Sequence, residues 1–390
     1  MRRDSLVEPV KARLHRLPEP YQAHYGVVPL PPPEDSIALG DALAANEAAQ
    51  RALAEADVMA RELKDPFLLS RVLTRKEAVS SSAIEGTHST LDELLVAEET
   101  NQEEASPATR QVRDYVFALE SLLPRAREIG HAIFSIDLVR QLHRNVMKSD
   151  PDYTDAPGEF RSRVVWIGGT GHIGTSTYSP PPPDVIDECI QQNVDYLKCE
   201  AMQAMTRGLI TRMAVAHAHF EAVHPFRDGN GRVGRLLLPL MMAGDGRVPL
   251  YLSPYIEAHK DHYYDGLKAA QQRLDWPAIV GFMADAVVGT VAEARRTRAD
   301  LSLLQASWKT RRSFREPSAA LRAIDILHEY PIVTIRRLES RLGVSFQAAS
   351  TAVRQLMEIG VLVERTGYKR NRLFSAEEAI KILNRPFGAL

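Results

Sequence analysis

The chain has 390 residues, of which 45% are hydrophobic and 25% are charged. This composition is typical of globular proteins, allows two or three domains, and argues against a disordered or fibrous architecture. Its apolar stretches, such as residues 236–243, are shorter than the roughly 20 residues of a membrane span, and the first residues lack the apolar core of a signal peptide. We therefore expect a cytoplasmic protein with no membrane partner.

The distribution of charge and the number of cysteines give further information on the domains and on the kinds of site that the chain can form. Residues 311–390 hold 14 Lys and Arg against 8 Asp and Glu, a net +6, whereas residues 1–310 carry a net −8. The basic C-terminal segment is therefore expected to form a unit of its own. The two cysteines, Cys189 and Cys199, are too few for a disulfide framework or a cysteine-based zinc site.

Helical patterns dominate the first third of the chain. Residues 18–33 are rich in proline and indicate extended chain, but over residues 36–123 apolar residues recur every three and four positions. Gly86 interrupts this run, which predicts a helix that ends at Glu85 with Gly86 as its C-terminal cap. Thr90 and Glu93 form a capping box at the start of the next helix.

The middle of the chain alternates predicted helices with glycine-rich turns. Residues 131–150 predict an amphipathic helix, and residues 158–178 predict a short β-hairpin that the prolines at 180–183 terminate. Further elements follow in the order helix from residue 185, helix over 205–222, glycine loop, helix over 232–242, helices after residues 253 and 276, and a polar, basic linker at 301–317.

The sequence HPFRDGNGRVGR, which begins at His224, concentrates groups that bind phosphate. Its glycines disfavour regular helix, so the N–H groups from Gly229 onward can face one point at the start of the next helix, where the helix dipole favours phosphate. Arg232 and Arg235 lie three apart, share a helix face, and carry guanidinium groups that suit phosphate oxygens. Asp228 offers an oxygen ligand of the kind that Mg²⁺ prefers, and His224 can accept a proton. The segment predicts a nucleotide-phosphate site with a base beside it.

This segment matches the Fic motif, His-x-Phe-x-(Asp/Glu)-Gly-Asn-Gly-Arg-x-x-Arg, at every specified position, and the chain resembles the Fic/Doc family over about residues 36–295. Members of that family usually transfer AMP from ATP, with Mg²⁺ (or Mn²⁺), to a Ser, Thr or Tyr hydroxyl of a target protein. The resemblance implies that His224 deprotonates the target hydroxyl and that Asp228 holds the metal ion. It assigns nucleotide binding to the other motif positions: Phe226 as the anchor of the loop, Gly229, Asn230 and Gly231 as the anion hole, Gly234, and Arg232 and Arg235 on the β- and γ-phosphates.

A second motif lies earlier in the chain. The sequence SSAIEG at residues 81–86 fits the inhibitory motif of Fic proteins, (Ser/Thr)-x-x-x-Glu-(Gly/Asn). The resemblance implies an inhibitory helix that contributes Ser81, Glu85 and Gly86, in which Glu85 pairs with Arg235 and keeps it from the γ-phosphate. The alternative is a helix-end glutamate that faces water. Whether Glu85 also assists removal of AMP stays open.

The sequence GTGHIG at residues 169–174 spells the dinucleotide fingerprint G-x-G-x-x-G, but the proline-rich residues after it cannot supply the helix that a Rossmann site requires. By resemblance to the Fic fold this region is the flap, whose exposed edge pairs with an extended segment of the target. Ile167, Gly168 and Gly169 are the predicted docking residues.

Side chains near the motif leave alternatives open. His217 and His219 lie two apart on a predicted helix, point away from each other, and belong to no HExxH pattern, so zinc is not expected. His219 is instead a candidate for lining the nucleotide pocket. Tyr263 and Tyr264 are either core residues or, by the family resemblance, neighbours of the adenine ring.

Residues 318–384 predict a helix, a short strand, two more helices and two strands, an order that resembles a winged helix-turn-helix. Its net positive charge favours DNA as a partner, whereas winged helices also dock proteins or form a homodimer. Both alternatives stay open. The recognition helix would contain residues 347–354, and the wing would contain Tyr368, Lys369, Arg370 and Arg372.

We therefore predict a mainly α protein with a Fic-type helical bundle core, a small β-hairpin flap and a C-terminal winged helix-turn-helix domain. The expected function is autoinhibited adenylylation of a target protein and of the chain itself. The alternatives are a DNA-binding regulator whose Fic core is a nucleotide sensor, or transfer of UMP, GMP or phosphocholine. The expected boundaries are 1–125 for an N-terminal helical region with the inhibitory helix at about 70–86, 126–300 for the core, 301–317 for the linker and 318–390 for the last domain.

Overall fold

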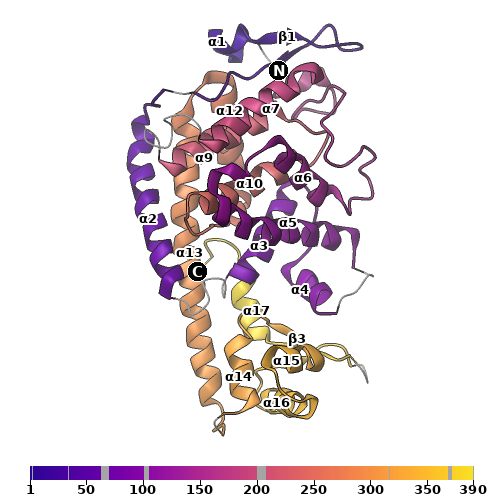
Figure 1. The fold of residues 1–390 in the computed structure, drawn as a ribbon, viewed down its shortest axis with the longest axis vertical. Helices are drawn as coiled ribbons and strands as arrows, with labels where there is room; N and C mark the ends of the chain where they lie inside the picture. The colour runs from indigo at the N-terminus through magenta and orange to yellow at the C-terminus, as the bar shows by residue number, and fades with distance from the viewer. Residues whose placement is uncertain are drawn as a thin grey trace.

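The computed structural model describes residues 1, 3–33, 35–62, 70–100, 105–199, 208–315, 317–367 and 371–389. A large helical body carries a smaller C-terminal unit at one end and a two-stranded sheet at the other (Figure 1). That sheet consists of β1 (Leu14–Arg16) and β2 (Tyr25–Val27), which are antiparallel. The helices of the body are α1 (Glu8–Lys11), α2 (Leu43–Glu62), α3 (Ser70–Ile84), α4 (Leu91–Thr100), α5 (Pro107–Ile129), α6 (Ile136–Met147), α7 (Ile186–Lys198), α9 (Leu209–Val223), α10 (Asn230–Gly244), α11 (Ser253–Ala258), α12 (Lys260–Arg273) and α13 (Trp276–Thr310). Short 3-10 helices occur at Arg3–Ser5, Gly40–Ala42, Gly130–Ile133, Ile173–Thr175 and Pro183–Val185.

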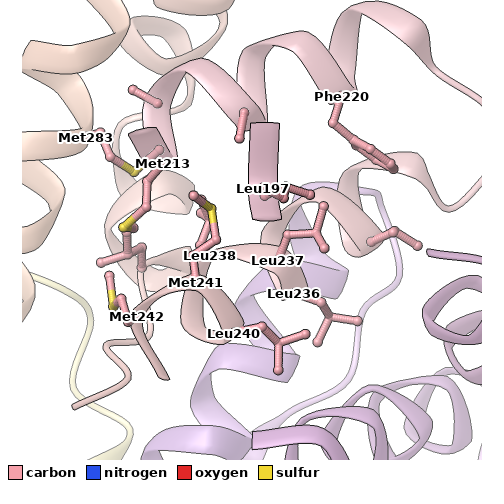
Figure 2. Packing of buried hydrophobic residues seen from close by; sticks show 14 of the residues in the cluster. Leu197, Met213, Phe220, Leu236, Leu237, Leu238, Leu240, Met241, Met242 and Met283 are labelled. Atoms are coloured by element: carbon pink, nitrogen blue, oxygen red, sulfur yellow. The ribbon is translucent and has the colours of Figure 1, made fainter. Parts of the chain in front are cut away.

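The helices α9 and α10 form the centre of the body. Every residue of α9 is buried, and so is every residue of α10 up to Ala243. A helix that is buried on all sides has to pack against neighbours all round, and the second half of α10 does so with four leucines and two methionines. This packing fixes both helices that flank the motif loop. Figure 2 shows part of the cluster, in which Leu236, Leu237, Leu238, Leu240, Met241 and Met242 of α10 lie near Leu197, Met213, Phe220 and Met283.

The long helix α13 joins the body to the C-terminal unit. It packs against α2, α9 and α12 in the body and then continues to Thr310 beside α14 and α17 (Figure 1). Leu301 and Trp308 are buried in the core of the C-terminal unit. This finding corrects the predicted linker at 301–317, because its first ten residues are helical and two of them fill a core.

By length and mean hydropathy alone, α13 would also pass as a helix able to cross a membrane. One face of its first half packs instead against other helices, with Ile279, Val280, Met283 and Val287 fully enclosed. The apolar composition of α13 is therefore explained by core packing.

The C-terminal unit contains the predicted elements in the predicted order. Its three-stranded antiparallel sheet has the strand order β3-β5-β4, and α14, α15 and α16 pack together beside it. The wing residues at 368–370 lie outside the described residues. The elements are α14 (Ala319–Ile326), β3 (Ile332–Thr334), α15 (Ile335–Leu342), α16 (Phe346–Glu358), β4 (Val363–Glu364), β5 (Leu373–Ser375) and α17 (Glu377–Leu383).

The C-terminal unit rests on α3 and α4, which precede the motif by more than a hundred residues. Val72 of α3 and Leu91 and Leu95 of α4 belong to the same apolar cluster as the core of that unit. The Arg71 guanidinium donates to the main-chain oxygen of Glu329 at 2.9 Å. The Lys76 ammonium group donates to the main-chain oxygen of Arg385, also at 2.9 Å. The helix that carries the start of the second motif is thus also held by the C-terminal unit.

Local predictions about helix ends hold closely. Thr90 N donates to Glu93 Oε2 at 2.9 Å and Glu93 N donates to Thr90 Oγ1 at 3.1 Å, which confirms the capping box. Gly86 has φ +84°, as a C-terminal cap requires, although α3 itself ends at Ile84. The boundary predicted at residue 125 falls inside α5, which continues to Ile129.

Candidate nucleotide-transfer site

The motif loop connects the end of α9 to the start of α10 through two residues in the left-handed region. His224 caps α9 with φ 48°, and Gly229 precedes α10 with φ 76°. Asn230 closes the loop, because its side chain accepts from Phe226 N at 2.8 Å and donates to Phe226 O at 2.9 Å. The loop therefore has a defined shape, with the free N–H groups of the first turn of α10 at its end.

Phe226 anchors the loop as expected. Its buried ring stacks on the His143 imidazole of α6, with centroids 3.7 Å apart and planes inclined by 6°. The same imidazole accepts from Gly158 N at 2.7 Å through Nδ1 and lies 3.1 Å from Asp228 O through Nε2. Burial lowers the pKa of His143 to about 4, so this imidazole stays neutral. Nothing in the local sequence pattern indicated His143.

Arg235 is held by the helix that carries the second motif. Its Nε donates to Ser81 Oγ at 2.9 Å, and one terminal nitrogen donates to Ser81 O at 2.9 Å and to Glu85 Oε1 at 2.7 Å. The Arg235 side chain is 1% exposed and that of Glu85 30%. Burial opposes both charges, but each partner favours the other: the pKa of Glu85 lies below its usual range and that of Arg235 above. The predicted contact between Glu85 and Arg235 is therefore present.

The Glu85 carboxylate also lies over the start of α10. A Cβ atom placed on Gly231 would stand 2.1 Å from Glu85 Oε1, so only glycine permits this approach. The start of a helix attracts anions through its free N–H groups and its dipole. Glu85 thus lies against the first turn of α10, the part of the loop where the sequence predicts phosphate binding.

Arg232 turns toward different neighbours from Arg235. It is 2% exposed and donates to Gln111 Oε1 of α5 at 3.0 Å and to Met147 Sδ of α6 at 3.0 Å. The Asp150 carboxylate lies 3.8 Å from its guanidinium. The two arginines start from one helix face but diverge along their side chains.

His224 is half-buried, with a side chain that is 21% exposed, and both positive and negative groups lie near it. Burial and, to a smaller extent, the positive charge of Arg161 lower the pKa of His224 to about 4, while Glu85 and Asp228 act in the opposite direction. Its Nδ1 lies 4.0 Å from Glu221 Oε2, one turn back on α9. Burial raises the pKa of Glu221 to about 8, so this carboxyl is mostly protonated at neutral pH. His224 is therefore an unprotonated imidazole over the physiological range.

Asp228 is the one exposed carboxylate within the motif loop. Its Oδ1 accepts from Gly229 N at 2.6 Å, which orients the carboxylate beside the start of α10. No group of three or more His, Cys, Asp or Glu in the described residues forms a protein-only metal site. A single carboxylate fits a Mg²⁺ ion whose remaining ligands are phosphate oxygens and water, so the residues present are compatible with the expected metal ion.

The structure separates the two histidines of α9. The His219 imidazole lies against Asn193 of α7, with 3.3 Å between Nδ1 and Nδ2, whereas His217 Nε2 contacts the Tyr263 hydroxyl at 2.6 Å. A Cβ on Gly234 would meet the His217 ring at 3.1 Å. The residue beside Gly234 of α10 is therefore His217, and the role of His219 in lining the nucleotide pocket stays a prediction. Residues two apart on a helix face different sides.

The two tyrosines of α12 also differ. Tyr263 is 1% exposed, packs against Phe282 and Tyr264, and belongs to the central apolar cluster. Tyr264 is 48% exposed. The core interpretation thus holds for Tyr263, and the adenine role of the pair stays a prediction.

The predicted flap is an ordered loop closed by a single β-bridge. Ile167 N donates to Tyr178 O at 2.9 Å and Thr177 N donates to Ile167 O at 2.9 Å. Gly168 and Gly169 are exposed and have φ +67° and +85°. Thr177 and Thr175 leave no room for a Cβ at either glycine. The hairpin is shorter than the sequence predicted because these glycines turn the chain directly after Ile167.

This fold and site define a Fic protein. Residues 43–122 match the family model described as Fic/DOC family N-terminal, and residues 133–242 match the model described as Fic/DOC family. The chain belongs to the Fic/DOC family.

Curated relatives match part of the chain. It is 35% identical over 133 residues to the protein adenylyltransferase fic-1 of Caenorhabditis briggsae, which covers 34% of this chain and 24% of the relative. It is 27% identical over 203 residues to a probable protein adenylyltransferase of Aquifex aeolicus, which covers 51% of this chain and 56% of the relative. The chain thus spans between about a quarter and just over half the length of these relatives.

Solved structures share the fold. A Fic family protein from Desulfovibrio desulfuricans superposes with a TM-score of 0.54 at 21% identity, over 89% of this chain and 98% of that chain. A Fic domain containing signaling protein from Bacteroides thetaiotaomicron gives a TM-score of 0.52 at 19% identity, over 63% of this chain and 95% of that chain. The first match includes most of the chain, so the helical body belongs to a known architecture.

Proposed function

We propose that this protein transfers AMP from ATP to a hydroxyl group of a protein, and that the contact between Glu85 and Arg235 holds it in an inhibited state. The observation that carries the proposal is the arrangement at the start of α10. There the buried guanidinium of Arg235 contacts the Glu85 carboxylate, which lies against Gly231 in the first turn of α10 and near the neutral imidazole of His224. The names of the matched relatives support the same reaction.

In this proposal His224 is the general base. Its Nδ1 faces the Glu221 carboxyl, so Nε2 is the nitrogen that accepts the proton of the acceptor hydroxyl. The hydroxyl oxygen then bonds to the α-phosphorus of ATP, the bond to the β-phosphate oxygen breaks, and pyrophosphate leaves. A pKa of about 4 makes the imidazole a weak base but keeps it unprotonated at neutral pH.

The other motif residues bind and orient the triphosphate. The N–H groups that follow Gly229 and the dipole of α10 attract a phosphate group, and Arg235 neutralises a terminal phosphate once Glu85 has left. Asp228 would hold Mg²⁺, which when bound supplies neutralisation of phosphate charge. Positioning and charge neutralisation are the main requirements of phosphoryl-type transfer. The acceptor hydroxyl would approach along the flap at Ile167, Gly168 and Gly169.

Inhibition follows from competition for one place. Glu85 and a terminal phosphate are both anions that need Arg235 and the start of α10, so they exclude each other. Replacing Glu85 by glycine removes the competitor while leaving Arg235 in position.

Labelling with ATP that carries the isotope in the α-phosphate tests both parts of the proposal. Glu85→Gly should incorporate more label than the wild-type chain, whereas Glu85→Gly combined with His224→Ala should incorporate none. Mass spectrometry of the labelled protein should find one AMP group on a Ser, Thr or Tyr. Equal labelling of all three proteins would contradict the reaction, and equal labelling of wild type and Glu85→Gly alone would contradict the inhibition.

A further inference from the structure

Arg161, just before the flap, is a buried cation that is held by main-chain oxygens. Arg161 is 4% exposed. Nε donates to His224 O at 2.8 Å, one terminal nitrogen donates to Pro181 O at 2.8 Å and to Val223 O at 3.3 Å, and the other donates to Arg163 O at 3.2 Å. The Arg161 main-chain N–H donates to Pro225 O at 2.9 Å.

This environment is unusual for a buried charge. In the part of the chain that the structure describes, no carboxylate lies within ion-pair distance of the Arg161 guanidinium, and burial lowers the pKa of Arg161 to about 10. A buried cation without a counter-ion is costly unless its donors are satisfied. Two of its acceptors, Val223 O and His224 O, are carbonyl groups at the C-terminal end of α9, where the helix dipole is negative. This end of α9 therefore supplies the favourable field that a carboxylate would otherwise provide.

The four carbonyl groups come from three places that the proposed reaction has to hold in register. Arg163 lies at the start of the flap, and Pro181 lies in the polyproline segment that follows the flap. Val223 and His224 form the end of α9, including the proposed base. One planar guanidinium group thus ties both ends of the flap to the main chain of His224, and it does so with donors in fixed directions.

We propose that Arg161 is a positioning residue that aligns an acceptor hydroxyl docked on the flap with the imidazole of His224. The inference rests on the proposed function, because it assigns a role in AMP transfer. In this inference Arg161 positions the acceptor hydroxyl, whereas residues of α3 and α10 position the nucleotide.

Arg161 also influences the proton affinity of the base. The charged and titratable groups that face His224 are Glu221 on the preceding helix α9, Glu85 directly after α3, Asp228 from the motif loop, and Arg161. Arg161 is the one among these four that disfavours the protonated imidazole. Loss of its charge should therefore raise the pKa of His224 from about 4 toward its ordinary value.

Two substitutions separate charge from geometry. Arg161→Met removes both the charge and the hydrogen bonds, whereas Arg161→Lys keeps the charge but cannot reach four carbonyl groups from one planar fork. Arg212→Met is the matched control, because Arg212 is equally buried at the other end of α9 and pairs with Asp245. It should destabilise the protein without affecting the flap or the base.

Each variant would be made in the full chain with Glu85→Gly, and three quantities would be measured: the rate of AMP transfer against pH, the Kd for ATP, and the pKa of His224 by NMR titration of histidine-labelled protein. We expect Arg161→Met to lower the transfer rate about 100-fold, as misplacement of reacting groups does, to leave ATP binding unchanged, and to raise the pKa of His224. Arg161→Lys should retain the low pKa and still lose most of the rate.

The outcomes separate this inference from the proposed function. An unchanged pKa of His224 in Arg161→Met, or a loss of ATP binding that parallels the loss of rate, would overturn the role of Arg161. If the Glu85→Gly parent transferred no AMP, the proposed function would fail. The NMR titration, together with faster hydrogen exchange of flap amides in Arg161→Met, would then still decide whether Arg161 ties the flap to His224.

Discussion

Arginines are abundant both around the motif loop and in the C-terminal unit, but the two regions use them differently. Arg232 and Arg235 are 2% and 1% exposed and are enclosed by side chains from other helices. In the C-terminal unit Arg365 pairs with Asp92 at 2.8 Å and Arg372 pairs with Glu364 at 3.1 Å, with each of these four side chains between 22% and 41% exposed. Arg365 and Arg372 are therefore partly exposed to water in the C-terminal unit, whereas Arg232 and Arg235 lie in the interior of the body.

The comparison teaches what an ion pair can do in each place. An exposed pair contributes about 0 to 1 kcal/mol and exchanges readily with water. A buried arginine that loses its partner is left as an uncompensated charge, which costs about 3–5 kcal/mol. Only the buried pair can therefore act as a switch, because its cation requires an anion, whether that anion is Glu85 or a phosphate group.

The ion pair at the contact between α3 and the C-terminal unit is intermediate in burial between these two cases. Arg71 pairs with Glu98 at 2.7 Å, both side chains are mostly buried, and the Arg71 guanidinium lies 4.5 Å from the centre of the Tyr330 ring. Since α3 carries Ser81 and Glu85 directly follows it, this interface supports the helix that holds Arg235. The following four predictions test whether the effect of removing a charged group decreases as the group becomes more exposed.

The largest effect is expected at Glu221, which is 7% exposed and pairs with no cation in the described structure. Its folded-state pKa of about 8 lies above the unfolded value, so its protonated form stabilises the fold at low pH and this stability is lost as pH rises from 4.5 through 8. Glu221→Gln should therefore equal wild type near pH 4.5 and exceed it by on the order of 3 kcal/mol at pH 7. Urea unfolding at both pH values measures this, and a difference that is the same at both would contradict it.

The next effect is expected for Glu85→Gly without nucleotide. Removing the carboxylate leaves Arg235 buried and uncompensated, although the 30% exposure of Glu85 reduces the loss to about 2 kcal/mol. Addition of ATP and Mg²⁺ should restore the melting temperature of the variant more than that of wild type, because only the variant has a free position at α10. Glu85→Gln, which keeps the shape, is the control and should respond less to ATP. Equal stabilisation of all three proteins would disconnect Glu85 from the nucleotide.

A smaller effect is expected at the interface. Arg71→Ala removes the pair with Glu98 and the contact with Tyr330, and it should lower the free energy of unfolding by about 1 kcal/mol. Because α3 is then held less firmly, AMP incorporation should rise modestly, by less than in Glu85→Gly. The variant Arg110→Ala, on α5, provides a control for removal of a helical arginine. Labelling that is identical in Arg71→Ala and wild type would show that the interface does not support inhibition.

The smallest effect is expected in the C-terminal unit itself. Arg365→Ala breaks an exposed pair with Asp92 and should change the free energy of unfolding by no more than about 0.5 kcal/mol, with a difference that disappears in high salt. A loss of more than 2 kcal/mol would place Arg365 among the buried arginines and remove the contrast between the two regions.

The sequence predicted the parts of this protein that short segments decide. Thr90 and Glu93 form the capping box, and the elements of the C-terminal unit follow the expected order. The sequence missed His143, Arg161 and Glu221. Glu221 lies three residues before His224, and this helical spacing could have predicted that the two side chains are neighbours. His143 and Arg161 lie in segments that match no functional motif.

Local sequence by itself determined where the motif loop begins and ends, because glycine, asparagine and helix-capping residues act on their immediate neighbours through backbone geometry. Only the tertiary structure decided which side chains meet there. Glu85 reaches Arg235 across 150 residues, and Arg161 reaches His224 across 63. It also decided that His217 and not His219 lies beside α10. The physical reason is that burial and charge compensation depend on how whole helices pack, and neither is encoded in the spacing of residues along one segment.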